Sequence, residues 1–247
     1  MTGEVRVIPL FGIPEIEEGD DLGALLVEAA NRGGGLAPHD VVVVAQKAVS
    51  KAEGRVVHLD EVEPSPEARA LAGTEDPRRI EVILRESRRV LRSRPPLVIA
   101  ETRHGFVCAS AGVDASNAKG PDTLVLLPLD PDASASQLRE RIRELTGVEV
   151  AVVVSDSFGR AWRTGTTDVA LGVAGMAPLI DLRGTRDAVG LELHATQIAM
   201  ADEIAGAAEL VMGKVDAVPA AVVRGLEPKG EGSGADLVMP PERDLFR

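Results

Sequence analysis

Runs of aliphatic and β-branched residues, bounded by polar or glycine-rich stretches, recur along the chain. Such runs are typical of buried strands. They predict strands over residues 4–10, 40–45, 97–101, 105–109, 124–127, 148–154 and 219–224. The short gap between 97–101 and 105–109 indicates a hairpin, so the sheet need not be parallel throughout.

Between these runs, apolar residues recur at helical spacing behind capping residues. Helix starts are predicted at Asp20 or Asp21, Ser65, Asp76 and Asp132. The first helix reaches about Asn31, and the last ends at Thr146 before Gly147. One apolar face of the helix after Asp76 is formed by Ile80, Val82, Ile83, Val90 and Leu91. The other face of this helix is rich in Arg and Glu and is expected to be solvated. An alanine-rich helix is predicted over 195–212.

Strands that alternate with helices predict a mixed α/β fold with α+β character. The 247 residues form one unit, in a single domain or in two subdomains, and the glycine- and proline-rich stretch 227–247 is expected to be a loop or tail. Aromatic residues are only 2% of the chain, so its core must be built from Val, Leu, Ile and Ala.

The net charge of −12 argues against nucleic-acid binding and against attraction to an anionic membrane. No apolar run approaches the roughly 20 residues of a membrane span. The single cysteine, Cys108, permits no intramolecular disulfide and is expected to be a buried, inert thiol. A cytoplasmic protein that binds small molecules is therefore expected.

A valine run ends at Asp156, which stands between Ser155 and Ser157 and is followed by Arg160 and Arg163. A carboxylate and hydroxyl groups at the end of a buried strand suit a hard cation such as Mg²⁺ or Mn²⁺. Guanidinium groups and glycine-rich backbone suit phosphate. Alternatively, Asp156 caps a turn and the arginines are solvated.

A second acidic segment contains Asp114 and Asn117. Two carboxylates brought together by a fold repel each other unless a cation lies between them, so convergence of Asp114 with Asp156 would predict a divalent-metal site. Two independent Asx turns are the alternative. Lys47, near a strand end with Lys51 and Arg55, could neutralise a polyphosphate, or these cations are solvated.

No G-x-x-x-x-G-K-[ST] loop, no G-x-G-x-x-G after a strand and no zinc-type spacing of Cys or His occurs. Several segments in order nevertheless resemble the coenzyme F420-0:L-glutamate ligase family. They are residues 12–14, 19–22, 40–55, 111–117, 155–160 and 220–226, and the resemblance covers roughly residues 5–246. It implies a mixed α/β fold that is not the P-loop fold, in an intertwined homodimer.

The resemblance also implies a GTP-dependent reaction with two divalent ions, Mn²⁺ or Mg²⁺, and K⁺. The γ-phosphate of GTP passes to the terminal carboxylate of the deazaflavin F420-0. The amine of L-glutamate then displaces phosphate, giving an amide and GDP. Neither the number of glutamates added nor the choice between manganese and magnesium follows from the sequence.

Matched position by position, the resemblance assigns metal binding and catalysis to Asp114 and Asp156, and a second ion to Ser157. It assigns GTP binding to Ile13, Pro14, Glu15, Ile16, Gln46, Lys47, Lys51, Asn117, Met212, Gly213, Lys214, Val215, Asp216, Ala217 and Val218. Arg160 and Arg163 are placed, by charge and position, at the phosphates of GTP or of the coenzyme precursor.

Lys214 departs from the pattern expected of archaeal relatives, which carry a metal-binding acid after Met-Gly. Either Asp216 replaces that ligand or the second ion is held differently. Two other hypotheses therefore stay open: a ligase of the same architecture for another carboxylate or amino acid, and a non-catalytic protein that binds nucleotide or deazaflavin.

Overall fold

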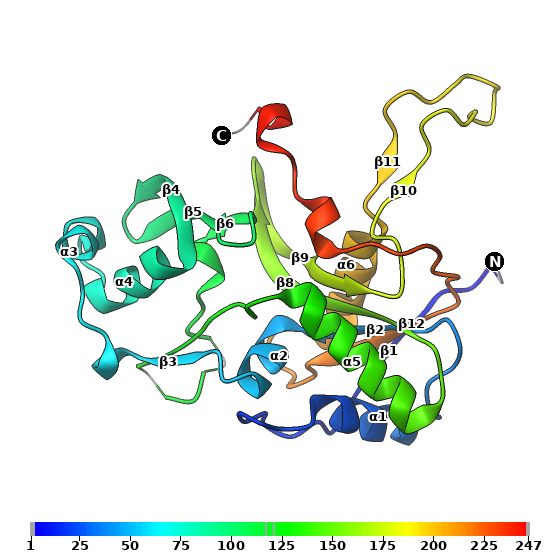
Figure 1. Ribbon diagram of the computed structural model, residues 1–247, viewed down its shortest axis with the longest axis horizontal. Helices are drawn as coiled ribbons and strands as arrows, with labels where there is room; N and C mark the ends of the chain where they lie inside the picture. The colour runs from blue at the N-terminus through cyan, green and yellow to red at the C-terminus, as the bar shows by residue number, and fades with distance from the viewer. Residues whose placement is uncertain (1–2, 117, 121, 246–247) are drawn as a thin grey trace.

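The computed structural model describes residues 3–116, 118–120 and 122–245. Its largest element is a five-stranded sheet with the strand order β1-β12-β2-β8-β9 (Figure 1). The strands are β1 (Arg6–Pro9), β2 (Val41–Ala45), β8 (Ala151–Arg160), β9 (Arg163–Ala174) and β12 (Ala220–Arg224). Only β2 and β8 pair in parallel within this sheet, while its other pairs are antiparallel. The predicted mixed α/β architecture is therefore confirmed.

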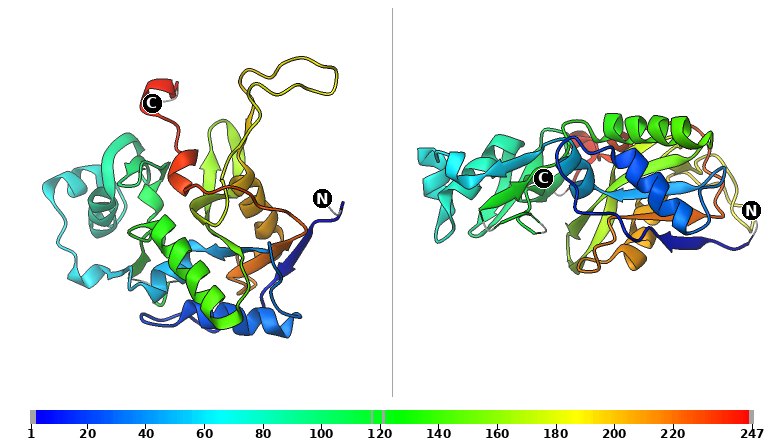
Figure 2. Two further views of the ribbon diagram at one scale, coloured as in Figure 1. Left: turned by 45° about the vertical axis from the view of Figure 1, so that its right-hand side comes forward. Right: turned by 90° about the horizontal axis from the view of Figure 1, so that it is seen from below.

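Helices cover both faces of this sheet (Figure 2). One face packs against α1 (Leu22–Arg32), α2 (Gln46–Ala52) and α5 (Pro131–Thr146), and the other against α6 (Met200–Met212). Successive strand side chains point to opposite faces. Val42 and Val152 accordingly join the first core, whereas Val43 and Val153 join the second. Both faces are buried, which explains why these strands are continuous runs of valine.

A smaller lobe lies beside the main sheet and has its own apolar core (Figure 1). It contains β3 (Val56–His58), η1 (Leu59–Glu61), α3 (Pro66–Ala72), α4 (Pro77–Glu86), β4 (Ser87–Arg94), β5 (Leu97–Thr102), β6 (Val107–Ala109), η2 (Ser110–Gly112) and β7 (Thr123–Val125). Strand β6 packs against β8 of the main sheet. The antiparallel pairing of β5 with β6 confirms the predicted hairpin.

Two segments extend beyond these layers. The short strands β10 (Ile180–Asp181) and β11 (Gln197–Ile198) form the base of an arm that projects from the body (Figure 1). The C-terminal stretch contains the short turns η3 (Gly234–Leu237) and η4 (Pro241–Arg243) but no longer element, as predicted for a tail. No helix among the described residues is long and apolar enough to cross a membrane.

Two helix predictions were wrong in detail. Helix α4 ends at Glu86, because the Ser87 hydroxyl donates to the Ile83 carbonyl at 2.6 Å and residues 87–94 then pair with β5. Val90 and Leu91 therefore belong to strand β4. Helix α6 begins at Met200 rather than at residue 195, since Gln197–Ile198 pairs with β10 instead.

The cap of α5 also differs from the prediction. Asp130 caps this helix and accepts from the Ala133 amide. Asp132, the predicted cap, instead accepts the amides of Val173 and Gly234, and so joins β9 to the C-terminal segment.

The strand that contains Asp156 does not stop there. Strand β8 continues to Arg160 and turns at Ala161 and Trp162 into β9, which pairs with it along its length. No apolar pattern in the sequence predicted this hairpin, because its outer half is polar and rich in threonine and glycine. Asp156 consequently lies within a paired strand, where its position is fixed by the hydrogen-bonded ladder.

Candidate functional site

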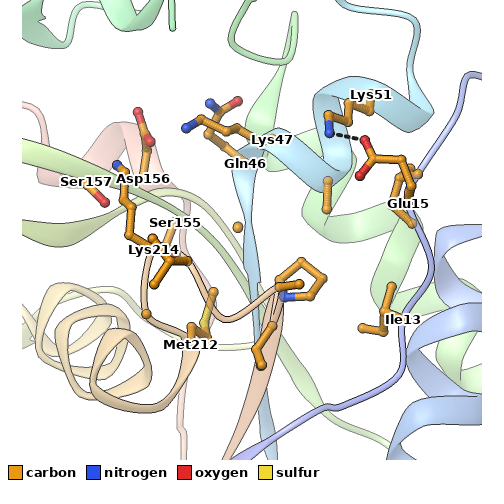
Figure 3. Close-up of a pocket in the computed structure, with 18 of the residues that line it drawn as sticks. Ile13, Glu15, Gln46, Lys47, Lys51, Ser155, Asp156, Ser157, Met212 and Lys214 are labelled. Atoms are coloured by element: carbon orange, nitrogen blue, oxygen red, sulfur yellow. Dashed lines mark hydrogen bonds and ion pairs between the residues drawn. The ribbon is translucent and has the colours of Figure 1, made fainter. Parts of the chain in front are cut away.

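A cavity of about 580 Å³ opens at the carboxyl ends of the parallel strands β2 and β8 (Figure 3). This edge of an α/β sheet is where ligands commonly bind. Helix α2 follows β2 without a break, which brings four of its residues to the wall: Gln46, Lys47, Ala48 and Lys51. The sequence-predicted residues that line the cavity are Ile13, Pro14, Glu15, Ile16, Gln46, Lys47, Lys51, Asp156, Ser157, Met212, Gly213, Lys214, Val215, Ala217 and Val218.

The lysines of the chain are concentrated here. The chain has five lysines, all of them within the described residues, and four of them line this one cavity. They are Lys47, Lys51, Lys119 and Lys214. Four carboxylates, those of Glu15, Asp156, Asp168 and Glu209, line the same cavity. In a protein whose net charge is −12, this concentration of lysines beside carboxylates indicates a site for an anionic ligand and a cation.

Two of these lysines are held in place by acidic partners. Lys51 pairs with Glu15 (Figure 3). Lys47 lies 2.7 Å from an oxygen of Asp114 and donates to the Ser116 hydroxyl at 2.6 Å. Both lysine side chains are only 13% exposed. Their ammonium groups are therefore oriented before any ligand arrives.

Asp156 is half-buried at the wall of the cavity. Withdrawal of its carboxylate from water, together with the charges of Asp168 and Asp114, raises its pKa to about 7, against the opposing effects of the Ser157 amide and the Lys47 charge. The ionised form is thus unfavourable as the site stands. A bound cation would relieve this cost directly.

A hydrogen-bond network orients the hydroxyl groups that flank Asp156. Ser155 donates to one oxygen of Asp168 at 2.8 Å, and Ser157 donates to the other at 2.7 Å. Asp168 is itself only 6% exposed, and its amide donates to Glu209 at 3.0 Å. Because the serine protons are committed to Asp168, the oxygen lone pairs of Ser157 are left to accept or to coordinate.

Asp114 stands next to this network rather than in the wall of the cavity. Burial alone would raise its pKa, but the hydrogen bonds from Lys47 and from Ser116 hold the pKa below its ordinary value. Asp114 also contributes to the field at Asp156. The two acidic segments picked out from the sequence therefore do come together, with Lys47 between them.

The donor set fits a hard cation at Asp156. Carboxylate and hydroxyl oxygens are the ligands that Mg²⁺ and Mn²⁺ prefer. Within the described part of the chain, no three His, Cys, Asp or Glu side chains are grouped so that they could hold a metal ion. An ion bound here would thus rely on Asp156 with one further carboxylate, and would take its other oxygens from hydroxyl groups, water or the ligand.

The loop between α6 and β12 forms another wall. Gly213 has a φ of +60°, and a Cβ atom there would lie 2.3 Å from an oxygen of Asp216. A glycine is therefore required, and Asp216 is folded back onto the loop instead of lining the cavity. The Lys214 side chain extends toward the end of the cavity that Asp156 and Ser157 line (Figure 3). An ammonium group thus lies where a second ion was expected from the family pattern.

Besides Asp114 and Asp216, the predicted residues Arg160 and Arg163 do not line the cavity. Arg160 and Arg163 flank the turn of the β8–β9 hairpin, where both are exposed and Arg160 donates to the Thr164 carbonyl. Asn117 lies outside the described residues. The roles assigned to Arg160, Arg163 and Asn117 stay predictions.

Asp168, Glu209 and Lys119 line the cavity but were not predicted from the sequence. Asp168 and Glu209 build the network at Asp156 with Ser155, whose hydroxyl the sequence had indicated, and Lys119 adds a fourth lysine. The only available signal for Asp168 was its polarity beside the apolar residues that follow it in β9. Recognising that signal would have required the hairpin, since pairing places Asp168 opposite Ser157.

Comparison with known proteins gives a consistent result. The model of a family described as F420-0:Gamma-glutamyl ligase matches residues 11–225. A Methanopyrus kandleri protein named coenzyme F420:L-glutamate ligase is 45% identical over 251 residues, which cover 98% of each chain. Proteins of the same name from Methanothermobacter thermautotrophicus and Archaeoglobus fulgidus are 44% and 42% identical. The matches cover 98% of this chain and 99% and 96% of those proteins.

Proposed function

Because the chain belongs to the F420-0:gamma-glutamyl ligase family, we propose that it joins L-glutamate to the deazaflavin coenzyme F420-0 through an amide (gamma-glutamyl) linkage, with GTP as the energy source. The γ-phosphate of GTP is transferred to the terminal carboxylate of the acceptor, which gives an acyl phosphate and GDP. The amine of L-glutamate attacks the acyl carbon and expels inorganic phosphate.

The observation that carries this proposal is the cavity with four of the five lysines and Asp156 in its wall. Phosphoryl transfer requires positioning and charge neutralisation more than covalent chemistry by the protein. Lys47 and Lys51 are pre-oriented to neutralise the phosphates of the nucleotide. The volume of about 580 Å³ is in the usual range of roughly 300–1000 Å³ for sites that hold a small organic ligand.

Gln46 supplies a further contact for the nucleotide. Its side chain is 1% exposed, and its carbonyl oxygen accepts from the Ser50 hydroxyl at 2.8 Å. The Nε2 atom of the same amide has no hydrogen-bond partner. A buried donor without a partner is costly, so a ligand acceptor in this cavity would stabilise the complex by completing the pair.

In this proposal Asp156 and Asp114 hold a divalent ion, Mg²⁺ or Mn²⁺, and Ser157, whose side chain points to the other face of β8, is the ligand that a second ion would use. Such an ion supplies charge neutralisation for the phosphates and for the attacking carboxylate. The residues fit one ion better than two, because Lys214 brings an ammonium group to Ser157 and Asp216 turns away. K⁺ enters the proposal as a monovalent activator on the family resemblance alone. An ion held by Asp114 would compete with Lys47 for this carboxylate, which would leave the Lys47 ammonium group free to meet the phosphates.

We also propose that the chain acts as a homodimer. The β10–β11 arm projects from the body and carries Val189 and Leu191, which are 82% and 68% exposed. Large apolar side chains on a projecting arm are typical of a surface that a second copy covers. An arm of this kind would give the intertwined form that the resemblance implies.

The test is product analysis. Purified protein is incubated with F420-0, L-glutamate, GTP and Mn²⁺, and the deazaflavin products are identified by mass spectrometry while GDP and phosphate are measured. Glutamylated product that requires all four components supports the proposal. If GTP binds but no product forms with any combination, the chain is a nucleotide-binding protein, the alternative that Lys214 favours. If another acceptor or amino acid is used more efficiently, it is a ligase of different specificity.

A further inference from the structure

A second, smaller cavity lies on the far side of Asp156. It has a volume of about 230 Å³ and is walled by the turn between β5 and β6, by β8 and β9, by α6 and by the C-terminal segment. Its lining residues include Phe106, Val107, Phe158, Asp202 and Met239. The volume is below the roughly 300–1000 Å³ usual for a whole ligand, so the cavity suits one end of a molecule.

Aromatic residues gather at this cavity in a chain that has very few of them. The chain has four phenylalanines and one tryptophan. Phe106 and Phe158 meet edge to face across the cavity wall, with ring centroids 6.3 Å apart and planes at 77°. Trp162, which is 85% exposed, lies at the turn of the hairpin that carries Phe158. Two of the four Phe and Trp side chains that the structure describes therefore line this one cavity, whereas Trp162 and Phe11 do not.

Strand geometry links this cavity to Asp156, beside which the carboxylate of the acceptor is proposed to react. Asp156 and Phe158 are alternate residues of a regularly paired stretch of β8, so their side chains point to the same face about 7 Å apart along the strand. Strand β6 faces them, since the charge of Asp156 acts on Cys108 of that strand. A molecule whose carboxylate reacts beside Asp156 would therefore extend directly over Phe158.

We propose that this cavity binds a flat polycyclic ring at the far end of the carboxylate acceptor, against the wall that Phe106 and Phe158 form. The inference rests on the proposed ligase function, in which the deazaflavin supplies such a ring. Aromatic walls favour a planar ring because stacked and edge-to-face pairs add about 0.5–1.5 kcal/mol beyond the burial of area. Asp202 adds one polar group that can accept from a ring N–H, and burial raises the pKa of this carboxyl.

The test measures ring binding separately from turnover. The probe is the deazaflavin riboside, which has the ring but neither phosphate nor carboxylate, and its binding is followed by fluorescence anisotropy. Phe106→Leu and Phe158→Leu should each weaken binding about tenfold, while the affinity for GTP stays unchanged and shows that the variants are folded. Phe11→Leu is the matched control and should bind the riboside as the wild type does. With the full acceptor, the first two variants should raise KM with little change in kcat.

Unchanged riboside binding in both cavity variants would overturn the inference, even if the wild type makes glutamylated product. A change of oligomeric state in these variants without a change in ring binding would assign the cavity to a second copy instead. Ring binding with the expected pattern, but without any glutamylated product, would uphold the ring site and refute the ligase function. A wild type that turns over the acceptor but shows no affinity for the riboside would also refute the ring site.

Discussion

Asp156→Asn should stabilise the folded protein at alkaline pH while it abolishes activity. In the folded protein the pKa of this carboxyl is raised to about 7 from its ordinary value of 3.8, chiefly by burial. Between these two values the folded state binds more protons than the unfolded state, so the contribution of Asp156 to stability falls as the pH rises. Above about pH 8 the carboxylate is ionised in both states and the loss is complete.

The size of the effect follows from the shift. From about pH 5 to pH 7, each pH unit lowers the contribution of Asp156 to the unfolding free energy by about 1.4 kcal/mol. Over the two units this makes roughly 3 kcal/mol if the charge is fully withdrawn from water. Asp156 faces an open cavity, and water there screens the charge, so we expect about 1–2 kcal/mol. The difference in unfolding free energy between Asp156→Asn and the wild type should grow by this amount between about pH 5 and pH 8.

Urea unfolding at several pH values, without divalent ions, measures this difference. Asp114→Asn is the matched control, and its unfolding free energy should be lower than that of the wild type. The reason is that the pKa of Asp114 is lowered in the folded protein and that the substitution leaves Lys47 without its partner. Added Mn²⁺ should stabilise the wild type at pH 8 and leave Asp156→Asn unaffected. A pH-independent difference, or an Asp156→Asn variant that is less stable than the wild type at pH 8, would refute the reasoning.

Three further predictions concern neighbouring residues. Lys51→Met should raise KM for GTP about tenfold, since one charged contact with phosphate is worth about 1.5–3 kcal/mol, and steady-state kinetics with the exposed Lys229→Met as control would show it. Asp168→Asn should lower both kcat and the midpoint of urea unfolding, because the amide can accept from only one of the two serines. A wild-type kcat and a wild-type midpoint would contradict the role given to the hydrogen bonds of Asp168. Lys214→Glu should increase the number of Mn²⁺ ions bound per chain in equilibrium dialysis, whereas an unchanged number would show that Lys214 does not exclude a second ion.

Much of the fold followed from local patterns. Valine runs marked β2 and β8 because a strand buried on both faces has to be apolar throughout. Capping residues marked helix starts correctly at Asp21, Ser65 and Asp76, since their side chains accept helix amides regardless of tertiary context. Where pairing decided the outcome, as at Val90 or in the outer half of β8, helical periodicity and local polarity were misleading.

The candidate site was predictable in part for the same reason. Lys47 and Lys51 follow the apolar strand β2 and Asp156 follows the valine run of β8, so their place beside the carboxyl end of the parallel pair could be inferred from the sequence. Asp168 and Glu209 reach the site through β9 and α6, whose contacts with β8 no local pattern encodes. The family resemblance named the loop at Lys214, but only the structure shows that Asp216 turns away from the cavity.

The most direct measurement follows oxygen atoms through the reaction. The acceptor is labelled with oxygen-18 in its terminal carboxylate and incubated with GTP, L-glutamate and Mn²⁺, and the released phosphate is examined by phosphorus NMR. Phosphoryl transfer to that carboxylate beside Asp156 predicts one labelled oxygen in phosphate for each amide formed. Amide product accompanied by unlabelled phosphate would contradict the proposed activation of the acceptor.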